Sequence, residues 1–360
     1  MSSKSGTLSA AVASDLQVGG SRTTLWSRLS LKSSTELQVA VALAALFTYF
    51  AVKYSATFLA DDNFLNMSRV AGILLVVAIG QMFALVVGGF DISVASNMGF
   101  VSTVVALRLT DGHPVADAVV WGLGAGALIG LANGILIAAF GVTPFVATLG
   151  MLGFLQGFGN EISNGQSIGG LNPDFQYFGG AGDWGFLPSA VGIALVVLVL
   201  AWLVLARLRA GLYIYAIGGS RETARVAGVP VVRYEILAYT TCGFLAGVAG
   251  VMLSSRVTVG QASLGAGYDL LSIATAVIGG VAIGGGIGKL RGVVLGVCLL
   301  TVLTTGMDIA TISSFTQQMI TGAVLIAAVL IAKLRGVQPL ANLKAMMRRS
   351  GGAVAGRAAS

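Results

Sequence analysis

The chain has 360 residues, of which 56% are hydrophobic and only 10% are charged, and its mean hydropathy is +0.90. A soluble domain carries about 25% charged residues, so this composition excludes an ordinary soluble protein and indicates an integral membrane protein. The net charge of +7 is concentrated in the two tails and two internal loops. That placement argues against a nucleic-acid-binding surface and instead reports the orientation of the chain in a membrane.

The apolar segments follow one another along the chain with short polar interruptions. A membrane span needs about 20 apolar residues, and the positions of Gly, Pro and charged residues divide the sequence into ten candidate helices. They are predicted at 37–57, 69–87, 94–109, 115–139, 144–159, 188–206, 233–254, 268–287, 292–309 and 317–333. The predicted fold is an all-α polytopic membrane protein with about ten transmembrane helices, several of them broken or short.

The two tails differ from the membrane region in composition. Residues 1–36 are Ser-rich and lack an apolar core, so we predict a disordered N-terminal tail. Residues 37–333 form the predicted membrane domain, and residues 334–360 form a basic C-terminal tail. With ten spans, every basic cluster falls on one side of the membrane, which the positive-inside rule identifies as the cytoplasm. Both termini are therefore predicted to be cytoplasmic.

A polar loop at 207–232 separates the first six predicted spans from the last four. Ser220 is a favourable helix N-cap, Glu222 falls in the first turn, and Gly228 can close the helix before Pro230. These signals predict a helix of about two turns, which is too short to be stable alone and needs a surface to lie on. Two interpretations remain open: an ordinary loop helix within a topology signal, or a docking helix for a soluble partner.

Two segments in the two halves of the chain have similar sequences. GGFDISVASN at 88–97 and GAGYDLLSIA at 265–274 each place glycines, an aromatic residue and an aspartate after a predicted span. TPFV at 143–146 likewise resembles SSFT at 313–316. In the predicted topology, the span at 69–87 that precedes the first motif runs toward the cytoplasm, and the span at 233–254 that precedes the second motif runs away from it. We therefore predict an inverted internal repeat, which in transporters places the pathway between the two halves.

Several polar residues and glycines lie within or beside the predicted spans. An aspartate at membrane depth costs roughly 2.5 to 3.5 kcal/mol, so Asp91 should have a partner or face water. It either caps a helix broken at the preceding glycines or contacts a substrate, and the capping role is favoured for Asp269. Hydroxyl and amide groups suit a neutral polyol, but they also serve as contacts between helices. The residues predicted to line a pathway or mark a helix break are Gly88, Gly89, Asp91, Asn133, Thr143, Pro144, Gln156, Asp269, Gly279 and Gly280.

The sequence offers little support for catalysis or for a bound cofactor. His113 is the only histidine, so no histidine cluster for a metal is expected. The string GGGIGKLRG at 284–292 lacks the glycine and the Ser or Thr of a phosphate-binding loop. ATP-driven transport would therefore need an ATPase on another chain. The outer loop at 160–187 is either a spacer or a vestibule for a soluble ligand carrier.

From about residue 66 to 333, the chain resembles permeases of the ribose, xylose and arabinose branch of ABC importers, in the superfamily that includes branched-chain amino acid permeases. Four motifs in order carry the resemblance: VVGGFDISVASNM, NGILIAAFGVTPFVATLGMLGFLQGFG, AIGGSRETARVAGV and GYDLLSIATAVIGGVAIGGGIGKLRGVVLG. The chain departs from the commoner pattern by having Ser220 for Asn, Asp269 for Glu and Val281 for Thr. These departures leave the substrate and the exact partner unassigned.

The resemblance implies a permease subunit that moves a monosaccharide into the cytoplasm and is not itself an enzyme. It implies a homodimer or a pseudo-dimer of such chains in the lipid of a bacterial inner membrane, ATPase subunits that bind ATP and Mg, and an extracytoplasmic sugar-binding protein. The residues implied to contact the ATPase are Gly218, Gly219, Ser220, Arg221, Glu222, Ala224, Arg225 and Gly228. A branched-chain amino acid permease of the same fold and an ion-coupled secondary transporter remain as alternatives.

Overall fold

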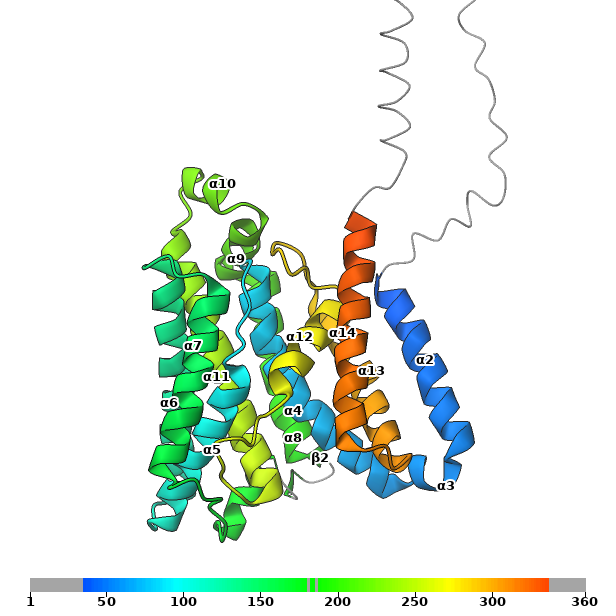
Figure 1. Ribbon diagram of the computed structural model, residues 1–360. Helices are drawn as coiled ribbons and strands as arrows, with labels where there is room; N and C mark the ends of the chain where they lie inside the picture. The colour runs from blue at the N-terminus through cyan, green and yellow to red at the C-terminus, as the bar shows by residue number, and fades with distance from the viewer. Residues whose placement is uncertain (1–34, 180–181, 185–186, 337–360) are drawn as a thin grey trace, which may run out of the picture. The chain divides into compact units, whose positions relative to one another are not determined.

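The computed structural model describes residues 35–179, 182–184 and 187–336. The predicted tails, 1–36 and 334–360, therefore lie almost entirely outside the described residues. Helices dominate the described part of the chain (Figure 1). They are α2 (Thr35–Lys53), α3 (Ser55–Phe58), α4 (Asp61–Val86), α5 (Val94–Thr110), α6 (Val115–Ala138), α7 (Pro144–Ile162), η1 (Pro173–Phe178), α8 (Ser189–Arg207), α9 (Arg209–Gly219), α10 (Arg221–Val226), α11 (Val231–Val257), α12 (Tyr268–Ile278), α13 (Leu290–Ile309) and α14 (Ser314–Gly336). Two short antiparallel strands, β1 (Asp183–Trp184) and β2 (Leu187–Pro188), form a hairpin.

A helix lies in each of the ten ranges that the apolar pattern marks. Among the described residues, six helices are long and apolar enough to cross a membrane by length and composition: α2, α4, α6, α8, α11 and α13. Shorter apolar helices are α5, α12 and the apolar part of α14. This confirms an all-α polytopic membrane protein.

Two elements differ from the sequence-based expectation. The predicted span at 268–287 is a helix only over α12, whose 11 residues are about 16 Å long, far short of the roughly 30 Å hydrocarbon core. The helix ends there because Gly280 has φ +89°, which belongs to the left-handed region and cannot continue an α-helix. The polar loop at 207–232 contains the additional helix α9, which buries Ile214 and Ile217 against the bundle.

Helix α4 forms the centre of the core. Its residues from Gly72 to Val86 are all buried, and α4 packs against α8, α11, α12 and α13. Its sequence is apolar on every side, as expected for a helix that is surrounded by other helices. Helix α11 runs antiparallel to it, because Asn66 early in α4 bonds Arg256 late in α11, while Gly80 lies against Cys242.

Helices α6 and α11 are in backbone contact along a row of glycines. Gly122, Gly126, Gly130 and Gly134 occur every fourth residue of α6 and therefore share one face of the helix. A Cβ atom added at Gly130 would overlap the backbone of Tyr239, so the close approach requires glycine. Small residues allow such contacts in membranes, where packing replaces the hydrophobic effect between helices. This glycine seam fixes α6 on α11.

Several elements meet at one end of the bundle, at the top of Figure 1. The N-terminus of α2 lies there, where Glu36 forms ion pairs with Lys289 (3.1 Å) and Arg291 (2.9 Å). The loop before α13 also reaches α4 and α9, because Gly286 N–H donates to the Val86 carbonyl (2.9 Å) and Gly286 lies against Gly219. Helix α10 lies at this same end, which we call the α10 end.

Candidate functional site

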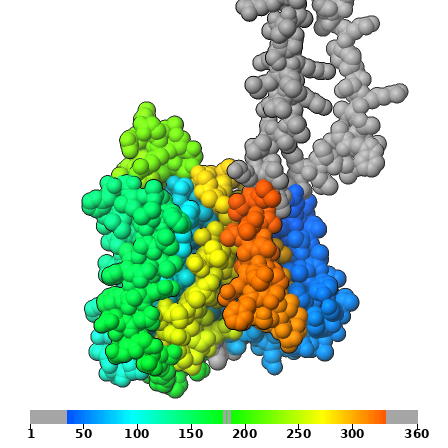
Figure 2. Space-filling view, viewed as in Figure 1, coloured from blue at the N-terminus to red at the C-terminus, as the bar shows by residue number. Residues whose placement is uncertain are grey.

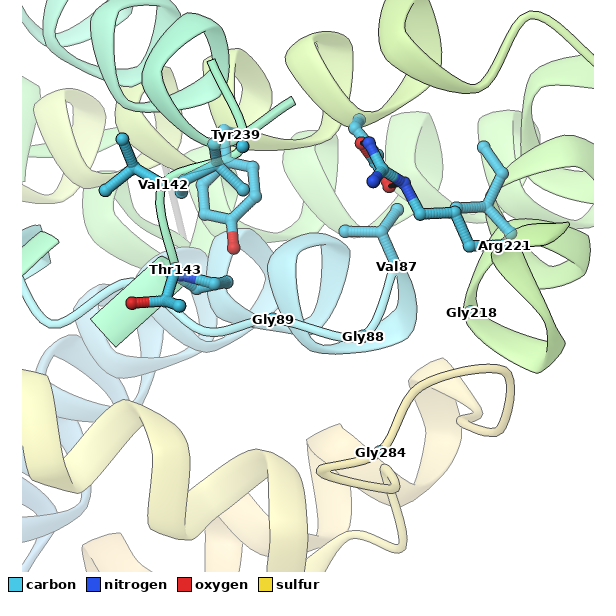
Figure 3. A pocket seen from close by; sticks show the side chains of 14 residues that line it. Val87, Gly88, Gly89, Val142, Thr143, Gly218, Arg221, Tyr239 and Gly284 are labelled. Atoms are coloured by element: carbon cyan, nitrogen blue, oxygen red, sulfur yellow. Dashed lines mark hydrogen bonds and ion pairs between the residues drawn. The ribbon is translucent and has the colours of Figure 1, made fainter. Parts of the chain in front are cut away.

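A cavity of about 400 Å³ opens at the α10 end (Figure 3). It is enclosed by the end of α4, the α6–α7 connection, the end of α9, the start of α11 and the loop before α13. Its lining residues are Val87, Gly88, Gly89, Ile137, Gly141, Val142, Thr143, Pro144, Ile217, Gly218, Arg221, Glu235, Tyr239 and Gly284. It brings together four predicted pathway residues, Gly88, Gly89, Thr143 and Pro144, with two predicted coupling residues, Gly218 and Arg221. We call it the α10-end cavity.

The helix break at 87–93 forms one wall of this cavity. Gly88 has φ +95°, and its neighbour Gly89 lies so close to Tyr239 that a Cβ atom there would overlap the tyrosine hydroxyl. Pro144, the first residue of α7, packs against the same glycine. Both glycines are therefore needed, the first for its backbone conformation and the second for the space above it.

Asp91 lies behind this wall, only 1% exposed, and is absent from the cavity lining. Its Oδ1 accepts hydrogen bonds from the Ser93 N–H (2.8 Å) and the Ser93 hydroxyl (2.6 Å), and its Oδ2 accepts one from Asn133 Nδ2 (3.3 Å). Gln81, with its amide oriented to satisfy both groups, bonds the Asp91 backbone N–H and carbonyl at 3.1 Å each. We call these four residues the Asp91 cluster. Its geometry fits the capping role predicted for Asp91, because the carboxylate accepts a backbone N–H freed by the break.

Two further side chains in the cavity wall come from one face of α11. Glu235, 7% exposed, forms a bidentate pair with Arg221, through Nε–Oε1 and Nη2–Oε2 contacts of 2.8 Å each. Tyr239, one turn later, is 1% exposed, and its hydroxyl has no hydrogen-bond partner among the described residues. Figure 3 shows its ring reaching toward the chain at Gly89.

The predicted helix after Ser220 is α10. The Ser220 hydroxyl accepts the Thr223 N–H (3.3 Å), and Gly228 follows the helix with φ +81°. These features confirm the predicted cap and stop. Ala224 is the residue of α10 that faces the rest of the protein, and it is only 4% exposed. Glu222 and Arg225 are exposed and form a weak ion pair, with 3.7 Å between Oε2 and Nη1.

The two glycines before α10 have different surroundings. Gly218 packs so tightly that a Cβ atom would overlap the Val86 carbonyl, whereas a Cβ atom at Gly219 would meet open space. Tyr215 of α9 donates to the Gly288 carbonyl (2.8 Å), and burial raises the pKa of this tyrosine, which keeps it protonated as a donor. Helix α9 is thereby joined to both α4 and the loop before α13.

Gln156 and Asp269 line a second, smaller cavity of about 130 Å³ between α5, α7 and the start of α12. The N-cap of α12 is Gly267, with φ +91°, so the predicted capping role of Asp269 is wrong. The Asp269 side chain has no hydrogen bond within the described chain and lies beside Ser96, whose hydroxyl is also unpaired there. Figure 2 shows the yellow start of α12 at the surface between green α7 and orange α14. We call this the α12 cavity.

The remaining two predicted pathway residues have packing roles. Gly279 ends α12 against Gly292 of α13, where a Cβ atom would overlap the facing carbonyl group. Gly280 turns the chain and lies near Thr35. In the described part of the chain, His, Cys, Asp and Glu form no cluster of three or more that could hold a metal ion.

Comparison with known proteins identifies the family. Residues 63–329 match the family described as the branched-chain amino acid transport system permease component. The chain belongs to this family of membrane permeases. The match covers α4 to α13 and most of α14, so it includes both cavities and α10.

The curated relatives of this permease include transport proteins for three sugars. It is 35% identical to the L-arabinose transport system permease protein AraH of Escherichia coli over 298 residues, 81% of this chain and 90% of AraH. It is 34% identical to the ribose import permease protein RbsC of Bacillus subtilis over 76% of this chain and 86% of RbsC. It is 30% identical to the D-allose transport system permease protein AlsC of Escherichia coli over 81% and 89%, respectively. No solved structure matches the permease.

Three polar side chains of the cavity and the cluster, Glu235, Tyr239 and Ser93, were not predicted from the sequence. Glu235 and Tyr239 lie in a long apolar segment, and their spacing of four residues is the only signal that they share a helix face. Ser93 follows the predicted aspartate by two residues, a spacing typical of a local turn. Gln81 lies within the predicted span at 69–87, and no local pattern connects its amide to Asp91.

Proposed function

We propose that this permease is the membrane subunit of an ATP-driven importer that moves a monosaccharide into the cytoplasm of a bacterium. The observation that carries the proposal is the similarity, over most of the chain, to permeases named for arabinose, ribose and allose. The polar side chains that line the α10-end cavity are the hydroxyls of Thr143 and Tyr239 and the paired Arg221 and Glu235. The two charges compensate each other, so the lining suits a neutral polyol better than a charged substrate. The chain itself transports and does not hydrolyse ATP.

The proposed topology has ten spans in an inverted repeat, with the α10 end in the cytoplasm. Lys289 and Arg291 lie at that end, as do the arginines around α10, which agrees with the positive-inside rule. Support for the repeat comes from α4 and α11, which are antiparallel and are each followed by a break and a shorter helix. The short α12 then resembles the discontinuous helices that form transporter sites.

The proposed partners are an ATPase subunit, which binds ATP and Mg and engages α10, and an extracytoplasmic sugar-binding protein. Helix α10 is suited to docking because nearly all of its surface is exposed, including Val226 at 82%. Among the predicted coupling residues, Glu222 and Arg225 within α10 and Gly219 and Gly228 on either side of it are all exposed.

A homodimer is proposed to form through α7. The exposed face of this helix has Gly150, Gly153 and Gly157 at its centre, where Cβ atoms would meet open space. Phe145 and Leu149 lie along one edge of this face, and Phe154 and Phe158 lie along the other. Small residues beside aromatic side chains allow a second helix to approach closely within lipid. The α12 cavity borders this face, so a dimer would enclose Gln156.

A branched-chain amino acid permease is the second candidate, favoured by the description of the matching family. The test is reconstitution of the chain in proteoliposomes with its ATPase and with candidate binding proteins. ATP-dependent uptake of labelled arabinose, ribose or allose supports the proposal, and uptake of leucine alone supports the alternative. Concentrative uptake by the chain without an ATPase would identify a secondary transporter and refute both.

A further inference from the structure

Tyr239 occupies the position where the α10-end cavity meets the Asp91 cluster. Its hydroxyl lies against Gly89, two residues before Asp91, and its Cβ lies 3.3 Å from where a Cβ atom of Gly134 would be, next to Asn133. The tyrosine is 1% exposed although it lines the cavity, so its ring is tightly enclosed. The ring therefore separates the cavity from the polar groups deeper in the bundle.

The enclosed Tyr239 hydroxyl and a nearby amide oxygen both lack hydrogen-bond partners in this arrangement. Both the Tyr239 hydroxyl and the Asn133 Oδ1 are buried without a hydrogen-bond partner among the described residues. Burying an unpaired polar group is unfavourable, so an arrangement that gives these atoms partners is favoured whenever the ring can move. Water or a sugar hydroxyl entering between them would supply those hydrogen bonds.

An ion pair connects α10 to the turn of α11 that precedes this tyrosine. Glu235 and Tyr239 are four residues apart, so they lie one above the other on the same face of α11. Arg221, the first residue of α10, holds Glu235 in a bidentate pair and also donates to the Ala138 carbonyl at the end of α6 (3.4 Å). Because Glu235 is 7% exposed, loss of this arginine would leave a carboxylate largely buried and unpaired.

We propose that Tyr239 is the plug that closes the α10-end cavity at Gly89, and that the Arg221–Glu235 pair ties this plug to α10. The inference rests on the proposed function, because α10 moves only if an ATPase engages it. When α10 is displaced, Arg221 pulls the first turns of α11 and the end of α6. Tyr239 then leaves Gly89 and opens the cavity toward the Asp91 cluster.

The plug is tested with the complete transporter in proteoliposomes loaded with whichever labelled sugar the wild type imports. Without ATP, Tyr239→Ala is expected to raise sugar efflux by at least about tenfold, because removing a buried aromatic ring leaves an open space. Gly89→Ala should also raise efflux, because its new Cβ atom displaces the ring. Tyr239→Phe, which keeps the ring, should hold efflux within about twofold of the wild type.

Tyr234→Ala is the matched control, since Tyr234 lies on the same helix but packs against Tyr213, outside the cavity lining. Its efflux should equal that of the wild type. Wild-type efflux from both Tyr239→Ala and Gly89→Ala, in variants that fold and assemble, overturns the plug. Equal leakage from Tyr234→Ala would likewise overturn it, because the effect would then be general loosening of α11.

The link to α10 is tested by the number of sugar molecules imported per ATP hydrolysed. Arg221→Glu and Glu235→Arg should each lower this ratio by about tenfold, because each removes the partner of a charged group, and the double exchange should restore it. A merely structural pair would reduce transport and hydrolysis together, leaving the ratio unchanged, and would overturn the link. If the wild type imports no sugar with any ATPase, the proposed function itself fails, which is a separate result.

Discussion

The two helix breaks that follow α4 and α11 have similar sequences but different surroundings. At 87–93, Asp91 is buried and bonded to Ser93 and Asn133. At 258–267, the chain forms a longer loop, held by the backbone pair of Ile168 and Gly260 and by Ser102, which accepts the Gln261 N–H (3.1 Å). Asp269 then lies within α12 at the edge of an open cavity.

The difference teaches that one motif supports two roles. At the first break, the carboxylate holds the backbone together, because it accepts the hydrogen bonds that a broken helix leaves free. At the second break, backbone contacts and the Ser102 hydroxyl hold the loop. The Asp269 carboxylate lines a cavity and has no hydrogen bond among the described residues, so we propose that it contacts a ligand. Four predictions test these roles, taken from the largest expected effect to the smallest.

Asp91→Ala should lower the free energy of unfolding by about 3 kcal/mol, because the Ser93 N–H and the Asn133 amide lose a buried acceptor. The measurement is the melting temperature of the purified chain in detergent, with Asp269→Ala as the matched control. Asp91→Asn, which keeps one acceptor oxygen, should lose less. A melting temperature of Asp91→Ala within about 1 °C of the wild type would show that the cluster does not stabilise the fold.

Asp269→Ala should reduce sugar uptake by about tenfold, the loss expected when a hydrogen bond to a charged group is removed, without changing the melting temperature. Initial rates of uptake in proteoliposomes measure it. If uptake is unchanged, Asp269 contacts no substrate, and the proposal that the two aspartates have different roles is wrong.

Gly88→Ala and Gly267→Ala should each lower the free energy of unfolding by about 1 kcal/mol, because both glycines have φ near +90°. The free energies of unfolding of the two variants should be measured in parallel. Equal losses would show that the two breaks share the same backbone geometry although their aspartates have different roles. Gly150→Ala on the exposed face of α7 is the control, because its new Cβ atom meets open space within a helix and should not lower the free energy of unfolding. A large loss at one glycine alone would show that the breaks differ in backbone as well.

Gln156→Ala should lower uptake by only about threefold, because amide contacts within membranes contribute about 0.6 kcal/mol on average. The initial rate of uptake and the melting temperature should be measured on the same preparation. A fall in melting temperature with unchanged uptake would reassign this amide from the α12 cavity to the packing of α7.

The sequence predicted the order of the helices because apolar run length and helix-ending residues are local signals. Ser220 and Gly228 illustrate this for α10, whose cap and stop depend on neighbouring backbone atoms only. The end of α12 was placed about nine residues too late, because the apolar residues after Gly280 continue the span pattern while the backbone has already turned. Composition does not reveal such a reversal when the loop itself is apolar.

Long-range contacts were the part that sequence reasoning could not supply. The pairing of Arg221 with Glu235 and the approach of Tyr239 to Gly89 join segments that local patterns treat separately. Gln156 and Asp269 were predicted individually, but their common cavity depends on how α7 and α12 meet. Helix α9 was missed because its buried face is defined by neighbours distant in sequence.

The glycine seam between α6 and α11 has a mechanical consequence. Since the two backbones interlock from Gly126 to Gly134, neither helix can slide or roll without colliding with the other. The two helices would therefore move as one rigid body, with the backbone bending only in the connections at 139–143 and 227–230. Spin labels placed on this pair should keep a constant separation throughout the transport cycle, even as their distances to α4 change.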